Sequence, residues 1–129
     1  MNETLQARAS SGPSVLDIEA TRQKLERSGG GQQVVYMSPA LEVCVEVFNS
    51  PGLGELRVED RDALYMVLDG SGMLGVENGD PLALVPGEAV VVPVGASHVI
   101  FGNPRLSLLI VTTTSQSARS SHLAAYRPI

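Results

Sequence analysis

The chain has 129 residues, which is the size of a single domain, and 43% of them are hydrophobic, so the composition excludes a wholly disordered protein. Nine Lys and Arg against fourteen Asp and Glu give a formal net charge of −5, which argues against nucleic-acid binding because that function needs a basic face. The one cysteine, Cys44, excludes an intramolecular disulfide and a four-cysteine zinc site. Two histidines, His98 and His122, are too few for a multi-histidine metal centre.

The sequence also bears on membranes and compartment. No apolar stretch approaches the roughly 18–20 residues needed to cross a bilayer, so no membrane contact is expected. The first fourteen residues contain no apolar block of the kind found in secretory signals. Together with the lone thiol, this predicts a cytoplasmic protein.

Residues 1–31 are expected to form an N-terminal arm with one short helix. The polar start of the chain gives way at Val15–Arg27 to a segment with a modest apolar stripe, in which Asp17 can act as a cap. Gly29–Gly31 then end the helix, because three glycines do not continue it.

Residues 32–114 have the pattern of short β-strands separated by turns. Leu41–Phe48 alternates between apolar and polar side chains, and Asn78-Gly79 is a hairpin signal. The predicted strands are Val34–Met37, Leu41–Phe48, Leu56–Glu59, Ala63–Leu68, Met73–Val76, Leu82–Val85, Ala89–Val92, Val99–Phe101 and Leu106–Thr113. Their spacing is typical of an antiparallel sandwich or barrel and does not separate the two. Residues 115–129 are predicted to be a C-terminal tail, with a short docking element as the alternative.

Residues 87–102 resemble the second signature of the cupin superfamily, which is Gly, five residues, Pro, one residue, Gly, two residues, His, three residues and Asn. Four of its five fixed positions are present, at Gly87, Pro93, Gly95 and His98, while Gly102 stands where the family has Asn.

A second stretch, Ala63–Gly72, looks like the end of the first cupin signature, with Ala63 in place of the family's Glu. The two resemblances imply an all-β protein with a cupin double-stranded β-helix, or jelly-roll barrel, and a short N-terminal helix. The family's metal does not carry over, since only His98 remains of the usual three His and one Glu. Glu59 beside Arg57 would add a poor second ligand, so no metal and no cofactor are expected.

Four polar residues are candidates for chemistry in the barrel. His98, Glu59 and Tyr65 are the proposed catalytic groups: His98 as an acid or base, Glu59 as its partner or as a base, and Tyr65 as a donor to a ligand oxygen. Arg57 could clamp a ligand carboxylate or phosphate through its planar guanidinium. The alternatives are a hydrogen-bonded core histidine, a core tyrosine, and a charged, solvated loop that contains Arg57 and Glu59.

The two faces of Leu41–Phe48 leave an alternative open. If Val43, Val45 and Val47 form the packed layer of the barrel, Cys44 and Glu46 face solvent. If that apolar face meets a second subunit, Cys44 and Glu46 look into the cavity.

The remaining predicted cavity residues are the apolar Met66, Met73 and Ile100, which favour a small, largely apolar ligand with at most one anionic group. The sequence thus predicts a metal-independent protein that binds a small organic molecule, with acid–base isomerase, cyclase or dehydratase chemistry. A non-catalytic metabolite-binding or sensing protein is the alternative, and a metal-dependent dioxygenase-like cupin the third hypothesis. Edge strands and the N-terminal arm predict a homodimer.

Overall fold

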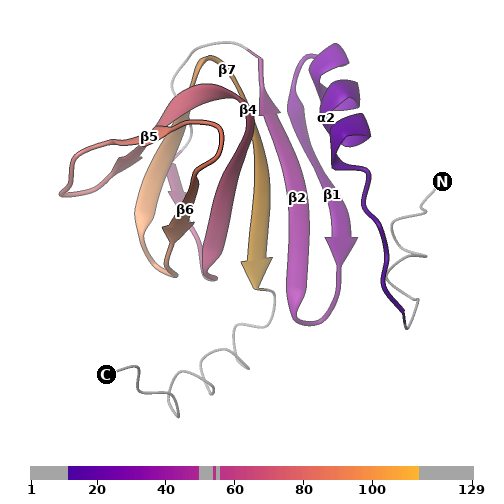
Figure 1. The fold of residues 1–129 in the computed structure, drawn as a ribbon. Coiled ribbons are helices and arrows are strands. Elements are labelled where there is room, and N and C mark those ends of the chain that lie inside the picture. The colour runs from indigo at the N-terminus through magenta and orange to yellow at the C-terminus, as the bar shows by residue number, and fades with distance from the viewer. Residues whose placement is uncertain (1–11, 50–53, 55, 114–129) are drawn as a thin grey trace.

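The structure is a computed structural model that describes residues 12–49, 54 and 56–113. Most of the predicted polar leader and the predicted C-terminal tail at 115–129 lie outside the described residues. Within them, one helix precedes seven strands (Figure 1). The elements are α2 (Ile18–Arg27), β1 (Gly31–Met37), β2 (Leu41–Phe48), β3 (Leu56–Val58), β4 (Ala63–Val76), β5 (Leu82–Leu84), β6 (Ala89–Val92) and β7 (Ser97–Thr113).

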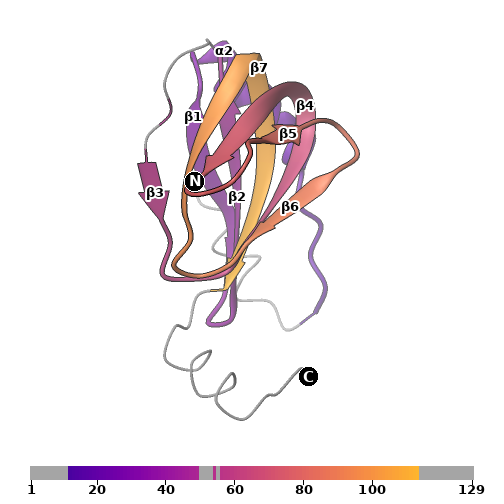
Figure 2. The ribbon, with the colours of Figure 1, turned by 90° about the vertical axis from the view of Figure 1, so that its left-hand side faces the viewer.

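Two long, bent strands, β4 and β7, run through both layers of the barrel. The first half of β4 pairs with β6 and with the second half of β7, which also pairs with β2, and β2 pairs with β1. The second half of β4 pairs with β5 and with the first half of β7, which also pairs with β3. Every pairing is antiparallel, and β3 lies at an edge of the second layer (Figure 2). The predicted jelly-roll barrel is confirmed.

The sequence divides β4 and β7 into two strands each, and the structure corrects this. Asp69–Gly72 has the composition of a turn, but the strand continues through it with two shifts of register against β7. Gly70 has φ +80°, and a Cβ atom there would clash with the backbone oxygen of Arg105. A glycine therefore lets the strand bend where a larger residue would force the two chains apart.

An apolar layer on the outer face of β2 fixes which side chains enter the barrel. Val43, Val45 and Val47 pack against Leu25 of α2 and Val35 of β1. Figure 1 shows α2 lying against β1 and β2 on their outer side. The apolar face is therefore covered by a helix of the same chain, and neither solvent nor a second subunit has to cover it.

The helix begins at Ile18, three residues later than predicted, because Asp17 is its cap and accepts a hydrogen bond from the Ala20 backbone N–H at 3.0 Å. Inside the barrel, a second apolar cluster includes Tyr65, Leu74 and Ile100. No helix among the described residues is long and apolar enough to cross a membrane.

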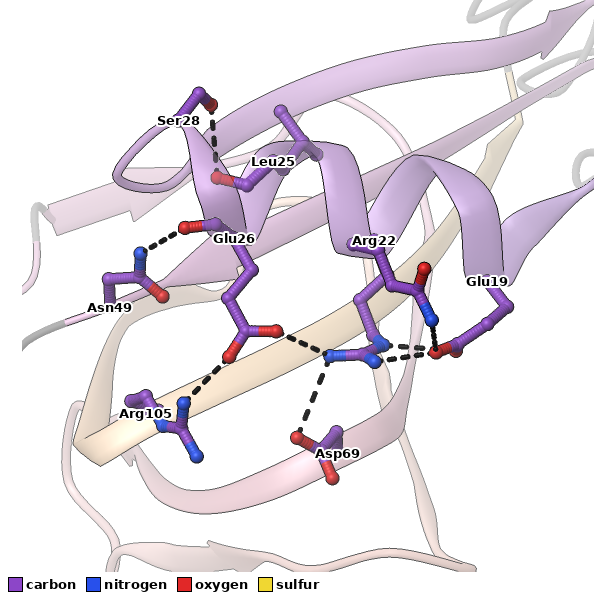
Figure 3. Close-up of polar contacts among 9 residues, drawn as sticks. Glu19, Arg22, Leu25, Glu26, Ser28, Asn49, Asp69 and Arg105 are labelled. Atoms are coloured by element: carbon purple, nitrogen blue, oxygen red, sulfur yellow. Dashed lines mark hydrogen bonds and ion pairs between the residues drawn. The ribbon is translucent and has the colours of Figure 1, made fainter.

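A second face of α2, which carries Arg22 and Glu26, makes polar contacts with the barrel (Figure 3). Arg22 forms ion pairs with Glu26 on its own helix and, at 3.7 Å, with Asp69 on β4. Arg105 on β7 donates to Glu26 at 2.7 Å, and the Asn49 side chain donates to the backbone oxygen of Glu26 at 2.8 Å. These contacts fix the position of α2 and, through it, the orientation of β2.

Candidate functional site

A cavity of about 90 Å³ lies between the two layers of the barrel. Its lining comes from β1, β2, β4, β7 and the segment that begins with β3, and consists of Gln32, Glu42, Cys44, Arg57, Glu59, Arg61, Tyr65, Ile110 and Thr112. The cavity is smaller than the pockets that enclose drug-sized ligands, which start at about 300 Å³.

The register of the strands explains why these side chains meet. Cys44 on β2 and Tyr65 on β4 both pair with Ile110 on β7, so the three residues share one face of the first layer. Arg57 on β3 pairs with His98 on β7 in the second layer, and their side chains meet Glu46 and Tyr65 of the first layer. Because α2 covers Val43, Val45 and Val47 on one face of β2, the polar side chains on the other face of β2 point toward the cavity.

Arg57 and Glu46 join the two layers. Arg57 Nη1 donates to Glu46 Oε1 at 3.0 Å, and Nη2 donates to Oε2 at 2.7 Å, which is the two-bond geometry that guanidinium and carboxylate groups favour. The side chains are only 21% and 12% exposed. Burial lowers the pKa of Arg57, but the hydrogen bonds and charge of Glu46, together with the contact with Tyr65, outweigh burial and the pKa is raised. Glu46 is a site residue that sequence analysis left open.

A second ion pair lies beside the first. Arg61 Nη1 is 3.4 Å from Glu42 Oε1, and Arg61 Nε is 3.4 Å from Asp60 Oδ1. Both arginines near the cavity therefore have carboxylate partners from this chain.

Tyr65 and His98 form a buried pair at the cavity wall. Tyr65 Oη lies 2.9 Å from His98 Nε2, and His98 Nδ1 lies 3.1 Å from the backbone oxygen of Ala96. A carbonyl oxygen only accepts hydrogen bonds, so Nδ1 carries the proton, and in the neutral ring Nε2 accepts from the tyrosine hydroxyl. Each residue is 1% exposed, but only Tyr65 lines the cavity. His98 therefore lies behind Tyr65 as seen from this cavity, and it lines a separate groove with Leu56 and Val99.

The buried environment also changes the pKa values of Tyr65 and Cys44. Burial raises the pKa of the Tyr65 hydroxyl, while the Arg57 guanidinium acts in the opposite direction. Burial and the nearby Glu46 carboxylate raise the pKa of the Cys44 thiol to about 11. Cys44 Sγ donates to Gln32 Oε1 at 3.5 Å. Cys44 is therefore a neutral hydrogen-bond donor at neutral pH, and a thiolate nucleophile is disfavoured.

Glu59 differs from the other carboxylates of the cavity. Its side chain lines the cavity, and its backbone oxygen accepts a hydrogen bond from the Gly95 N–H at 2.9 Å. In the part of the chain that the structure describes, its carboxylate has no hydrogen-bond or ion-pair partner. It is thus the carboxylate available to a bound molecule.

The three apolar residues predicted for the cavity lie elsewhere. Met66 is 38% exposed on the face of β4 opposite Tyr65, and Met73 lies on the face opposite Leu74. Ile100 points inward but is packed in the apolar cluster. The lining of this cavity is mostly polar, whereas the expected ligand is largely apolar. Gln32, Glu42, Arg61 and Thr112 were missed, although the polar face of Leu41–Phe48 was a signal for Glu42.

The residues present do not fit the metal site that is typical of the cupin superfamily. No three His, Cys, Asp or Glu side chains converge to hold an ion among residues 12–49, 54 and 56–113. His98 Nε2 is engaged by Tyr65, and the cationic Arg57 stands opposite His98 in the register. A guanidinium next to the one imidazole disfavours a divalent cation there.

Solved structures decide the fold family. An RmlC-like cupin family protein with a double-stranded β-helix fold from Methanocaldococcus jannaschii matches over 70% of this chain and 85% of its own, with a TM-score of 0.63 and 14% identity. The chain has the cupin fold. KdgF from Halomonas sp. matches this cupin barrel over 71% of the chain and 84% of its own, with a TM-score of 0.61 and 20% identity.

A third match is a proposed mannose-6-phosphate isomerase from Ralstonia eutropha, with a TM-score of 0.58 and 19% identity over 67% of this chain and 85% of its own. At these identities the cupin fold is shared, and the activity does not follow from it. No protein-family model and no curated protein matches the sequence.

Proposed function

We propose that the barrel cavity binds a small polar organic molecule and that Tyr65 and His98 exchange a proton with it, without a metal, in an isomerase-type reaction. The observation that carries this proposal is the 2.9 Å contact between the Tyr65 hydroxyl at the cavity wall and the His98 imidazole behind it. Proton transfer needs only positioned acid and base groups and a site that excludes bulk water.

The proton moves along a short chain of groups. A ligand C–H or O–H bond breaks and its proton passes to the Tyr65 oxygen, while the Tyr65 proton passes to His98 Nε2. The resulting imidazolium keeps its Nδ1–H bond to Ala96, which holds the ring in place. The reverse transfer returns a proton to a neighbouring ligand atom, so the net change is a shift of hydrogen with no oxidant or reductant.

Two further residues face the bound molecule in this proposal. Glu59 accepts a hydrogen bond or a proton from the ligand, because its carboxylate has no partner within the described chain. Arg57 contributes its positive charge next to Tyr65, which favours the phenolate-like state during transfer. The sequence-based role of Arg57 as an anion clamp requires a free guanidinium, and Glu46 already occupies it.

Solvent deuterium exchange tests the proposal. Hydroxyacetone, aminoacetone and pyruvate are similar in size and differ in charge, and proton NMR in D₂O follows loss of their carbon-bound hydrogens. The wild-type protein is expected to accelerate exchange in at least one of them. Tyr65→Phe should abolish that acceleration, while the half-buried Tyr36 on β1 provides the matched control Tyr36→Phe, which should keep it.

Two outcomes of this experiment contradict catalysis: exchange at the buffer rate with all three compounds, or full acceleration by Tyr65→Phe. Retained binding without exchange would favour the second candidate, a non-catalytic metabolite-binding protein. A specific observation supports that candidate, namely that His98 is 1% exposed and hydrogen-bonded at both ring nitrogens, as structural histidines are.

A further inference from the structure

Resting on the function proposed above, we infer that the molecule the cavity takes carries a primary ammonium group, that Glu59 is the counter-ion of this group, and that carboxylates and phosphates are excluded. The inference concerns the charge of the ligand, which the proton-transfer proposal leaves open.

The Arg57 guanidinium is not available to an anion. Both Arg57 nitrogens that could form a two-bond clamp already donate to Glu46. Arg61 has a buried Nε without a hydrogen-bond partner among the described residues, but its positive charge is offset by Glu42 and Asp60, each 3.4 Å away. A ligand carboxylate would have to displace Glu46, whose side chain is only 12% exposed. The displaced carboxylate would then be left largely buried without a partner, which is strongly unfavourable.

The charges around the cavity favour a cation. The charged lining residues and their direct ion-pair partners are Glu42, Glu46, Glu59 and Asp60 on the acidic side and Arg57 and Arg61 on the basic side. The carboxylates outnumber the guanidiniums, and Glu59 has no cationic partner in the described chain. A positively charged group is attracted to such a site, and an anion is repelled.

The hydrogen-bonding groups of the cavity wall also favour an ammonium group. An ammonium group donates three hydrogen bonds and accepts none. The Glu59 carboxylate accepts, and the Tyr65 oxygen keeps one acceptor position beside its contact with Arg57, because its own proton is directed to His98 Nε2. The cavity therefore offers acceptors to a donor-rich group that faces Tyr65 and Glu59.

The volume limits the size of the group. About 90 Å³ is well below the volume of a pocket that encloses a drug-sized ligand, so only a small ammonium compound fits within the cavity. Larger amines would have to leave the rest of the molecule at the mouth of the barrel.

Equilibrium binding tests the inference with probes of one size. Ethylammonium, ethanol and acetate are titrated into the full-length protein at constant ionic strength, and heteronuclear NMR shifts of the Tyr65 and Glu59 backbone amides report occupancy. Ethylammonium is expected to shift these signals with saturation, and acetate is expected to leave them unchanged. Glu59→Gln should weaken ethylammonium binding at least tenfold.

The matched control is Glu77→Gln, which removes one carboxylate from an exposed position outside the cavity lining and should leave binding unchanged. Saturable binding of acetate, absence of ethylammonium binding, or equal affinity in Glu59→Gln would each overturn the inference. The two experiments distinguish a failure of this inference from a failure of the proposed function. Ethylammonium binding without deuterium exchange would contradict catalysis and leave the ligand charge supported. Deuterium exchange in pyruvate without ethylammonium binding would contradict the ligand charge and leave catalysis supported.

Discussion

Replacing Glu46 with glutamine is expected to destabilise the protein, because the substitution leaves the Arg57 charge without its partner. The pair has two short, charge-assisted hydrogen bonds, 3.0 and 2.7 Å, between side chains that are 21% and 12% exposed. Hydrogen bonds to charged groups contribute about 1.5–3 kcal/mol, and breaking a fully buried pair costs about 3–5 kcal/mol. Residual exposure and the remaining amide oxygen reduce this, so we expect a loss of about 2–3 kcal/mol.

Urea denaturation followed by far-UV circular dichroism measures this loss as a lower midpoint with an unchanged slope. For a domain of this size the same loss lowers Tm by about 6–15 °C. Glu19→Gln is the matched control, since it removes one carboxylate partner of Arg22 on the helix surface, where the Glu19 side chain is 60% exposed. Its midpoint should not change measurably.

The result that would refute the reasoning is a loss below about 0.5 kcal/mol in Glu46→Gln, the range of a solvated surface pair. Arg57 would then be free to bind an anion, and the inferred preference for ammonium ligands would lose its first argument. The double variant Glu46→Leu with Arg57→Met distinguishes the net contribution of the ion pair from the cost of leaving one charge buried without a partner. Because both charges are replaced by apolar side chains, this variant should recover most of the stability lost in Glu46→Gln.

Three further predictions concern the core, the bend of β4 and the cavity thiol. Leu74→Ala removes a fully buried side chain and should cost about 2–5 kcal/mol in free energy of unfolding, measured by the same denaturation. Gly70→Ala should cost at least about 2 kcal/mol, because φ is +80° and the added Cβ would clash with the Arg105 oxygen; a neutral effect would contradict the bend. At pH 8, Cys44 should react with iodoacetamide roughly a hundredfold more slowly than a free thiol, since its pKa is about 11. Because the unfolded chain loses the Cys44 proton at lower pH than the folded chain, stability should fall between about pH 8.5 and 11, and Cys44→Ala should remove that part of the fall.

Local sequence signals determined much of the fold. Leu41–Phe48 and Ala89–Val92 are predicted with the bounds that β2 and β6 have, because alternation and flanking turn residues act within a few positions. Asn78, with φ +63°, lies in the turn between β4 and β5, as the hairpin signal indicates. The resemblance of residues 87–102 to the cupin signature then indicated a jelly roll rather than another antiparallel barrel.

Only the tertiary structure decided how the site is built. A period of two divides β2 into two faces but does not say which one is inside, and the docking of α2 against Val43, Val45 and Val47 made that choice. The paired groups are far apart along the chain: the sequence separation is 11 for Glu46 and Arg57 and 33 for Tyr65 and His98. Such contacts depend on strand register across the barrel, which no local pattern encodes.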